Sequence, residues 1–224
     1  MNRRGVLTLF GLAGGAWLTR RAFAQAPAGC VVRPQQTEGP YFVDERLNRA
    51  DIRSDPATGT VKAGVPLEIV FRVSDLIGAR CVPLAGAMVD VWHCDAHGAY
   101  SDVQDAAGDT RGQRFLRGYQ ATDAAGIARF MTIYPGWYEG RAVHVHFKIR
   151  TAPAAGRGRE FTSQLYFDEA LTEQVHAHAP YVRHGRRVPN ERDGLFRRGG
   201  RDLILGAKKA DPGYTGMFDI ALAG

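Results

Sequence analysis

The stretch Tyr138-Glu-Gly-Arg-Ala-Val-His-Val-His-Phe147 carries the clearest structural signal in this chain. Apolar and polar side chains alternate through it and beyond, with Val143, Val145, Phe147 and Ile149 on one parity and Ala142, His144, His146, Lys148 and Arg150 on the other. A period of two is typical of a β-strand with one apolar and one polar face. On such a strand both imidazoles point the same way and can reach one metal ion, whereas on a helix they would point about 200° apart.

Other segments show the same short-strand character. We expect strands at 66–74, 87–93, 128–134, 143–150, 161–167, 203–205 and 217–222, and a helix only at 169–179. The sequence at 123–126 has the turn chemistry of a hairpin. Many short strands separated by Gly and Pro predict a mainly β fold, an antiparallel β-sandwich with little helix, whose long loops carry the active site.

The first 24 residues are expected to be an export signal rather than part of the fold. A basic start with Arg3-Arg4 precedes a short apolar run, and Ala22-Phe23-Ala24 has the pattern of a cleavage site. The run is too short to span a bilayer, which takes about 20 apolar residues. The paired arginines favour the twin-arginine route, with an ordinary secretion signal as the alternative. The protein is therefore expected outside the cytoplasm, periplasmic or released, with no membrane attachment after cleavage.

Residues 25–224 are long enough for one domain with a sizeable core. The formal charge of +6 falls to +2 once the signal is removed, because the signal holds four arginines and no acidic residue. The basic character of the full chain therefore does not indicate nucleic-acid binding.

Three cysteines in an exported chain allow one disulfide and leave one further thiol. Cys81 and Cys94 bracket an extended segment, which places them beyond the roughly 7 Å that a disulfide can bridge. We expect Cys30 to pair with Cys94, with Cys81 as the alternative partner. No two cysteines have the spacing of a zinc site.

A metal site is predicted around the two histidines. Tyr138 lies in the loop before them, and Tyr100 follows the strand expected at 87–93. A bound cation can displace a phenol proton, as it does for water and thiols. Hard anionic phenolates beside two imidazoles favour Fe(III) over zinc, copper or Fe(II). The candidate ligands are thus Tyr100, Tyr138, His144 and His146, with non-heme Fe(III) as the cofactor.

With these residues in view, the chain resembles the intradiol ring-cleavage dioxygenases, the group of catechol 1,2-dioxygenase and protocatechuate 3,4-dioxygenase. Matching pieces appear in the family's order and cover most of the chain after residue 24. They are Thr37-Glu-Gly-Pro-Tyr41, Pro83-Leu-Ala-Gly-Ala87 leading into Val91-Trp-His93, Gly98-Ala-Tyr-Ser101, Thr132-Ile-Tyr-Pro-Gly136, Arg141-Ala-Val-His-Val-His146 and Thr162-Ser-Gln-Leu-Tyr-Phe167.

The resemblance implies roles for individual residues. The four candidate ligands match the family's Fe(III) ligands, and Tyr138 would also act as the base that takes a substrate proton. Arg141 matches the arginine that stabilises the anionic substrate, and Gln164 matches a glutamine near that arginine. Tyr41 and Trp137 are expected to line the substrate pocket. The implied reaction is cleavage of a catechol with O2, between its two oxygen-bearing carbons, to a muconate-type diacid.

The chain also departs from the best-known members of that family. It is expected to carry an export signal and to lack the helical N-terminal linker through which catechol 1,2-dioxygenases dimerise, so its oligomeric state is left open, with a homo-oligomer as one option. A non-catalytic exported β-sandwich module that binds aromatic ligands is the alternative function, and another iron-dependent oxidation is a third.

Three other histidines, His93, His176 and His178, are not expected to bind a metal. His176 and His178 also have the two-residue spacing, but on a weak helix, where their side chains diverge. His93, which follows Trp92 at a strand end, is expected to pack or to hydrogen-bond behind the ligands.

Overall fold

The computed structural model describes residues 30–105, 108–152, 158–181 and 185–223. The predicted export signal at 1–24 lies outside these residues. No helix in the described part of the chain is long and apolar enough to cross a membrane.

One sheet has four strands, which lie side by side in the order β6-β3-β8-β9. Their bounds are Arg117–Ala121 for β6, Met88–Trp92 for β3, His144–Arg150 for β8 and Glu160–Tyr166 for β9. All three pairings in this sheet are antiparallel. The predicted histidine strand is therefore a central strand, flanked on both sides by backbone partners.

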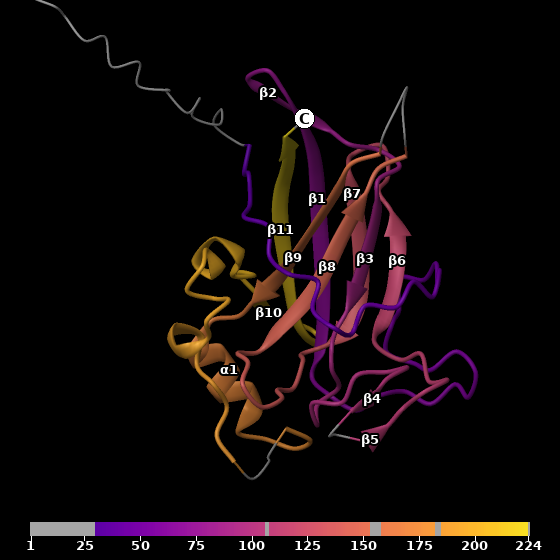
Figure 1. Cartoon of the computed structure of the whole chain (residues 1–224), viewed down its shortest axis with the longest axis vertical. Coiled ribbons are helices and arrows are strands. Elements are labelled where there is room, and N and C mark those ends of the chain that lie inside the picture. Colours follow the sequence, from indigo (N-terminus) through magenta and orange to yellow (C-terminus); the bar gives the residue numbers. More distant parts are fainter. Residues whose placement is uncertain (1–29, 106–107, 153–157, 182–184, 224) are drawn as a thin grey trace, which may run out of the picture.

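The second sheet has the order β10-β11-β1-β2, with β7 paired to β1 as well. Its strands are β1 Pro66–Ile77, β2 Arg80–Pro83, β7 Ile127–Ile133, β10 Lys208–Ala210 and β11 Gly213–Ala223. β1 and β11 run parallel, whereas the other pairs of this sheet are antiparallel. The last strand of the described chain thus lies beside the first. A small hairpin of β4 (Gln104–Asp105) and β5 (Gly108–Asp109) stands apart from both sheets (Figure 1).

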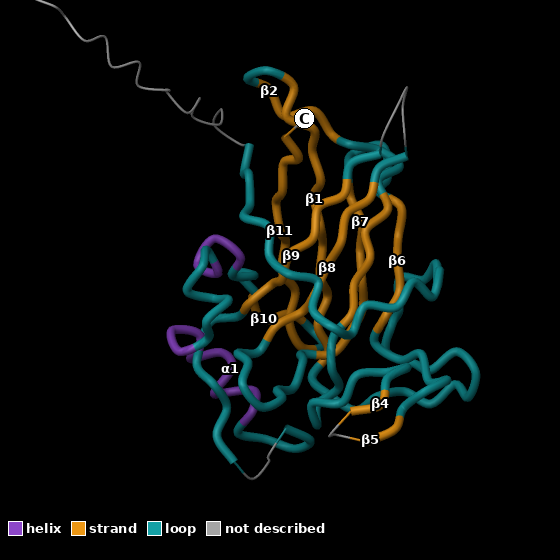
Figure 2. Tube along the Cα trace, in the orientation of Figure 1, coloured by secondary structure: helices purple, strands orange, loops and turns teal. Residues whose placement is uncertain are grey.

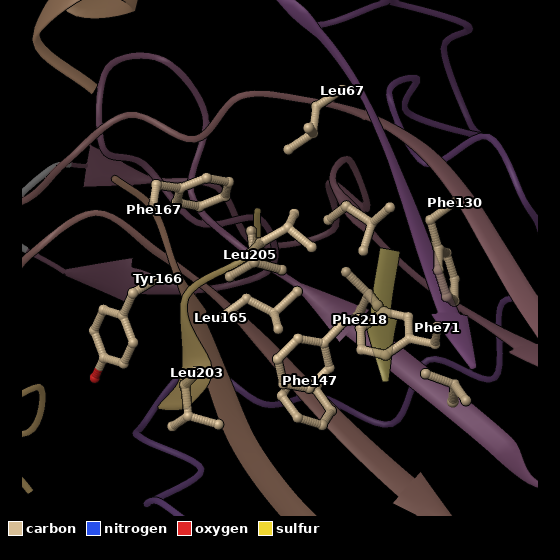
Figure 3. Close-up of a cluster of buried hydrophobic side chains, with 14 of the residues drawn as sticks. Leu67, Phe71, Phe130, Phe147, Leu165, Tyr166, Phe167, Leu203, Leu205 and Phe218 are labelled. Carbon is tan, nitrogen blue, oxygen red and sulfur yellow. The ribbon is translucent and has the colours of Figure 1, made fainter. Parts of the chain in front are cut away.

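The core lies between the two sheets. The Phe147 ring from β8 lies 5.2 Å from Phe71 of β1 and 5.6 Å from Phe218 of β11, measured between ring centroids. Figure 3 shows this cluster, with Leu165 and Leu205 closing it on one side. The apolar parity of β8 thus faces the opposite sheet, and the predicted β-sandwich is confirmed.

The polar face of β8 is buried as well, because the segment 34–44 crosses it. Lys148 forms an ion pair with Glu38, and its ammonium group lies 4.4 Å from the ring centroid of Phe42. Arg150, two residues further along the strand, pairs with Asp44 at 3.0 Å. In Figure 1 this indigo segment passes in front of β9 and β8. We call residues 30–44 the strap, because they close the histidine side of the sheet.

Helical structure gathers at one end of the sandwich, where β8 begins (Figure 2). Helix α1 spans Glu169–His176, and its N-cap is Asp168, whose carboxylate accepts a hydrogen bond from the Leu171 N–H. Two short 3₁₀ helices follow, η1 at Asn190–Arg192 and η2 at Gly200–Leu203. This end of the molecule is rich in loops, and it also carries the β4–β5 hairpin (Figure 1).

The predicted strand at 203–205 is wrong. Gly199 has a φ of +92°, which lets the chain turn tightly into η2, and Leu203 ends that helix. Only Ile204 makes an isolated bridge, to Tyr166. The apolar character of this segment agrees with its burial, since Leu203 and Leu205 are both buried.

The turn at 123–126 forms, with the Gly126 N–H donating to the Asp123 carbonyl at 2.9 Å. It does not close a hairpin between paired strands, because β6 belongs to one sheet and β7 to the other. The turn therefore carries the chain from one layer of the sandwich to the other.

The predicted disulfide between Cys30 and Cys94 is also wrong. Cys30 is bonded to Cys81, the alternative partner, with their Cα atoms 5.5 Å apart. The strap begins beside the last strand, where the Ala221 N–H donates to the Val31 carbonyl, and this brings Cys30 to the β1–β2 end of the sheet. Cys94 follows β3 at the opposite end and is a buried thiol in the aromatic cluster around Tyr100.

Candidate metal centre

Four side chains converge where β8 begins. His144 and His146 extend from the same face of the strand, and their Nε2 atoms lie 3.0 Å apart. Tyr138, in the loop before the strand, places its hydroxyl oxygen 3.3 Å from Nε2 of His144. Tyr100, in the loop after β3, places its hydroxyl oxygen 3.5 Å from the same nitrogen. The structure thus brings together all four of the predicted ligands.

The loop that presents Tyr100 is held by Asp95. One oxygen of this buried carboxylate accepts the backbone N–H groups of His97 and Ala99, at 2.9 and 3.1 Å. The other oxygen accepts a bond from Lys62 at 2.8 Å. Because a charged carboxylate makes short, strong bonds to backbone N–H groups, the tight turn before Tyr100 is fixed rather than adaptable.

Each histidine ring is oriented by a contact on the side that faces away from the other ligands. Nδ1 of His144 donates to the Ala142 carbonyl at 2.7 Å, so the proton is on Nδ1 and Nε2 presents its lone pair to the centre. The His146 ring stacks on Trp92, with the centroids 5.0 Å apart and the planes 6° from parallel. Nδ1 of His146 has no hydrogen-bond partner in the described part of the chain, so packing alone sets this ring.

Burial keeps all four groups neutral. It lowers the pKa of His144 to about 3 and that of His146 well below its usual value. It also raises the pKa of Tyr138 to about 12 and that of Tyr100 well above its usual value. Two neutral imidazoles and two phenols in a buried site offer lone pairs to a cation, and a cation of high charge is what would ionise the phenols.

The donor set fits a non-heme Fe(III) ion. Two imidazole nitrogens bound about 2.1 Å from one ion at adjacent positions lie roughly 3 Å apart, as the two Nε2 atoms do here. In the described residues, no three His, Cys, Asp or Glu side chains group together as a metal site. A metal at this place would therefore depend on Tyr100 and Tyr138, and paired phenolates favour a hard trivalent ion.

Arg141 lies beside the four ligands. Its Nη1 atom is 3.5 Å from both the Tyr138 hydroxyl and Nε2 of His144. Its Nη2 atom donates to Oε1 of Gln164 at 2.6 Å, in agreement with the expected neighbourhood of these two residues. The guanidinium thus places a fixed positive charge at the edge of the site, next to the more exposed of the two tyrosines.

The sequence reasoning missed Asp193, which lies behind Arg141. Its Oδ2 atom accepts Nε of Arg141 at 2.9 Å and the Ala142 N–H at 2.8 Å. Burial favours the neutral acid, but these bonds outweigh it and hold the pKa of Asp193 below its usual value. The sequence around Asp193-Gly194 indicates only a turn, and nothing local in it points to a residue some fifty positions earlier.

Tyr41, one of the two residues expected to line the substrate pocket, lies against both candidate tyrosine ligands. Its ring stacks on Tyr100, with centroids 4.2 Å apart, and meets Tyr138 edge-on at 6.0 Å. Trp137 belongs to the main core and lines a separate hollow with His176 and other residues near α1. Consecutive residues of an extended loop point to opposite sides, which explains why Tyr138 faces the site and Trp137 does not.

The remaining histidines have other surroundings. His93 is buried, with Nδ1 bonded to the Cys94 carbonyl and Nε2 to the Thr132 hydroxyl. His176, near the end of α1, is bonded through Nε2 to the Pro135 carbonyl, and His178 is exposed. The second pair of histidines therefore does not form a two-imidazole site.

Residues 37–184 match the family model described as Dioxygenase. Among relatives, the chain is 26% identical over 150 residues to chlorocatechol 1,2-dioxygenase of Rhodococcus opacus, covering 58% of this chain and 54% of that enzyme. It is 30% identical over 137 residues to the protocatechuate 3,4-dioxygenase beta chain of Burkholderia cepacia, covering 57% and 56%. The chain thus spans about half the length of the curated relatives it matches.

Solved structures extend the match to nearly the whole described chain. The intradiol ring-cleavage dioxygenase from Tetranychus urticae is 31% identical, with a TM-score of 0.73, over 86% of this chain and 94% of that one. The dioxygenase domain of a carbohydrate-binding fusion protein from Streptomyces sp. SirexAA-E is 30% identical, with a TM-score of 0.62, over 86% and 99%.

Proposed function

This chain belongs to the intradiol ring-cleavage dioxygenase family, and from that premise we propose that it opens catechol-type rings with O2 at a non-heme Fe(III) centre. The observation that carries the proposal is the convergence of both tyrosine hydroxyls and Nε2 of His146 on Nε2 of His144, at 3.0 to 3.5 Å from it, beside Arg141. A binding module for aromatic ligands would need the stacking surface of Tyr41 but not this donor set.

Tyr100, Tyr138, His144 and His146 would hold the iron. Bound Fe(III) supplies Lewis acidity, which makes the two hydroxyls of a catechol easier to ionise. The protein supplies the rest of the chemistry, beginning with a buried, largely apolar setting in which charges interact strongly.

The two tyrosines differ in a way that suits two roles. Tyr100 is 1% exposed and is covered by the stacked ring of Tyr41, so it is the fixed partner. Tyr138 is partly exposed, on a loop, with Arg141 beside its hydroxyl. Because Tyr138 is the more exposed of the two and Arg141 stands beside its hydroxyl, it is the residue that would take a proton from the substrate hydroxyl.

Arg141 would stabilise the anionic substrate. Burial disfavours a negative charge on the ring oxygens, and a guanidinium held within reach offsets that cost. Nη1 is the nitrogen that faces the centre, while Nη2 is bonded to Gln164. Cleavage between the two oxygen-bearing carbons would then give a muconate-type diacid.

The substrate is proposed as a catechol-type aromatic, since the relatives are named for chlorocatechol, catechol and protocatechuate. We also propose that the enzyme works outside the cytoplasm, in the periplasm or beyond, after removal of residues 1–24. The Cys30–Cys81 disulfide supports an oxidising compartment. Mass determination of the protein from its native host would test this, with a mature N-terminus at Gln25 as the expected result.

Iron content and colour test the centre itself. Phenolate bonded to Fe(III) absorbs visible light, so the iron-loaded protein should be reddish and should consume O2 with a panel of catechols. His144→Ala and His146→Ala should each lose iron and colour, while the matched control His178→Ala, in the other histidine pair, should keep both. Full iron occupancy in both ligand variants would refute the assignment.

A further inference from the structure

Arg141 is held by three groups on the side of its guanidinium that faces away from the four candidate ligands. Asp193 binds Nε at 2.9 Å, and Gln164 binds Nη2 at 2.6 Å. The Tyr166 hydroxyl lies 3.4 Å from Nη2 on the same side. These contacts occupy the rear of the guanidinium fork and leave Nη1 as the nitrogen turned toward the four ligands.

Among the described residues, Nη1 of Arg141 makes no close hydrogen bond. Its distances to the Tyr138 hydroxyl and to Nε2 of His144 are both 3.5 Å, at the outer limit for a hydrogen bond. Its N–H groups are thus directed at the centre with donor capacity to spare for a substrate oxygen. The direction in which Nη1 points is set by the rear contacts, because a guanidinium is planar and rigid.

Of the three groups that hold Arg141, Asp193 is the charged one, and its own carboxylate is fixed by backbone hydrogen bonds. Its side chain is 1% exposed. Oδ1 accepts the backbone N–H groups of Leu195 and Phe196, at 2.6 and 3.2 Å, and Oδ2 accepts that of Ala142 at 2.8 Å. Three backbone bonds fix the carboxylate, and the fourth goes to Arg141.

Asp193 also joins parts of the chain that are far apart in sequence. It lies directly after η1, and its carboxylate accepts the Ala142 N–H. This bond connects the η1 segment to Ala142, which follows Arg141 and lies two residues before His144. Rotation of the carboxylate would therefore move the guanidinium relative to the start of β8.

We propose that Asp193 is the positioning residue of Arg141, a fixed carboxylate that sets the guanidinium so that Nη1 faces the catechol oxygens. The inference rests on the proposed function, because it assigns Asp193 a part in binding the anionic substrate. It predicts that Asp193 acts on turnover only through Arg141.

The test is a double-mutant cycle on the iron-loaded protein, with Asp193→Asn, Arg141→Ala and the pair. Asn has nearly the same size but carries no charge and cannot accept four bonds, so kcat/KM should fall about 10- to 100-fold, the range seen when a supporting partner of a reactive group is removed. Iron content and the visible absorption band should stay as in the wild type. In the Arg141→Ala background the same change should have no further effect on kcat/KM.

Asp168→Ala is the control for the loss of a backbone cap. Asp168 also caps a backbone N–H, that of Leu171 at 3.0 Å, but it has no contact with Arg141. It should lose stability with kcat/KM unchanged, which separates loss of a cap from loss of positioning.

Arg141→Lys gives a second route if Asp193→Asn does not fold. Lysine keeps the charge but has no fork for Asp193 and Gln164 to hold, so kcat/KM should fall about 10- to 100-fold while iron content and the visible absorption band stay as in the wild type. Wild-type turnover in Arg141→Lys would overturn the proposal, as would an undiminished effect of Asp193→Asn in the Arg141→Ala background. A wild-type protein that binds no iron and opens no catechol would instead overturn the proposed function, and this role with it.

Discussion

Gly39 lies against the edge of His146. A Cβ added at Gly39 would stand 3.2 Å from Cε1 of that imidazole, and the backbone φ of +73° already favours glycine. The strap therefore closes over the histidine through a residue that has no side chain. This contact explains why the polar face of β8 is buried and yet leaves room for both imidazoles.

Gly39→Ala should weaken the centre. The left-handed backbone costs a non-glycine residue about 1–2 kcal/mol, and the new methyl group would also push on His146. Gly59→Ala is the matched control, since Gly59 has a φ of +71° and nothing within 4 Å of its Cβ position. Gly39→Ala should lose at least as much stability as Gly59→Ala in thermal unfolding, and only Gly39→Ala should lose iron faster to a chelator. Equal rates of iron loss would show that the strap does not support His146.

Tyr138→Phe should separate iron binding from proton transfer. Three ligands remain, so the variant should retain iron, with weaker visible absorption because one phenolate is gone. Turnover of catechol should fall about a hundredfold or more, as expected when a general base is removed. Tyr214→Phe, a change in the opposite sheet, should leave both properties unaltered. Catechol cleavage at the wild-type rate in Tyr138→Phe would remove the base role from this residue.

His93 should make stability depend on pH. Burial lowers its pKa to about 4, whereas an exposed imidazole titrates near 6.5. Between these values the unfolded chain takes up a proton that the folded protein does not, so stability falls as pH drops from about 6.5 to about 4. His93 contributes a slope of up to about 1.4 kcal/mol per pH unit there.

Urea unfolding across this pH range would measure the effect. His93→Gln should be less stable near neutral pH, but its stability should fall less steeply toward pH 4 than that of the wild type. Parallel pH profiles for the two proteins would mean that folding does not lower the pKa of His93.

The Cys30–Cys81 disulfide should contribute substantially to stability. It closes a loop with a sequence separation of 51, for which the chain-entropy model gives about 4 kcal/mol. A reductant should therefore lower the free energy of unfolding of the wild type and of Cys94→Ala by similar amounts, and should leave Cys81→Ser unchanged. Loss of the reductant effect in Cys94→Ala would contradict the pairing.

The parts of this structure that could be predicted from sequence are those with local causes. The alternation through His144 and His146 predicted a strand with both imidazoles on one side, and the strand is there as β8. The resemblance of short motifs to a known family predicted that Arg141 and Gln164 lie near each other at this site, and they do.

What the sequence did not reveal depends on contacts between distant segments. Asp193 meets Arg141 across a separation of 52 residues. The pairing of Cys30 depends on the path of the strap along the sheet edge, and the parallel pairing of β1 with β11 joins the two ends of the domain. None of these relationships has a periodic signal, because each is set by how the layers pack.

The measurement that tests the central claim most directly is the product formed from a catechol and ¹⁸O₂ by the iron-loaded protein. Catechol, protocatechuate and hydroxyquinol would be supplied in turn, and the products would be identified by mass. At least one of the three catechols should give a muconate-type diacid, opened between the two oxygen-bearing carbons and carrying label from O2. A semialdehyde from cleavage beside the diol, or an unopened ring despite bound iron, would contradict the proposed function.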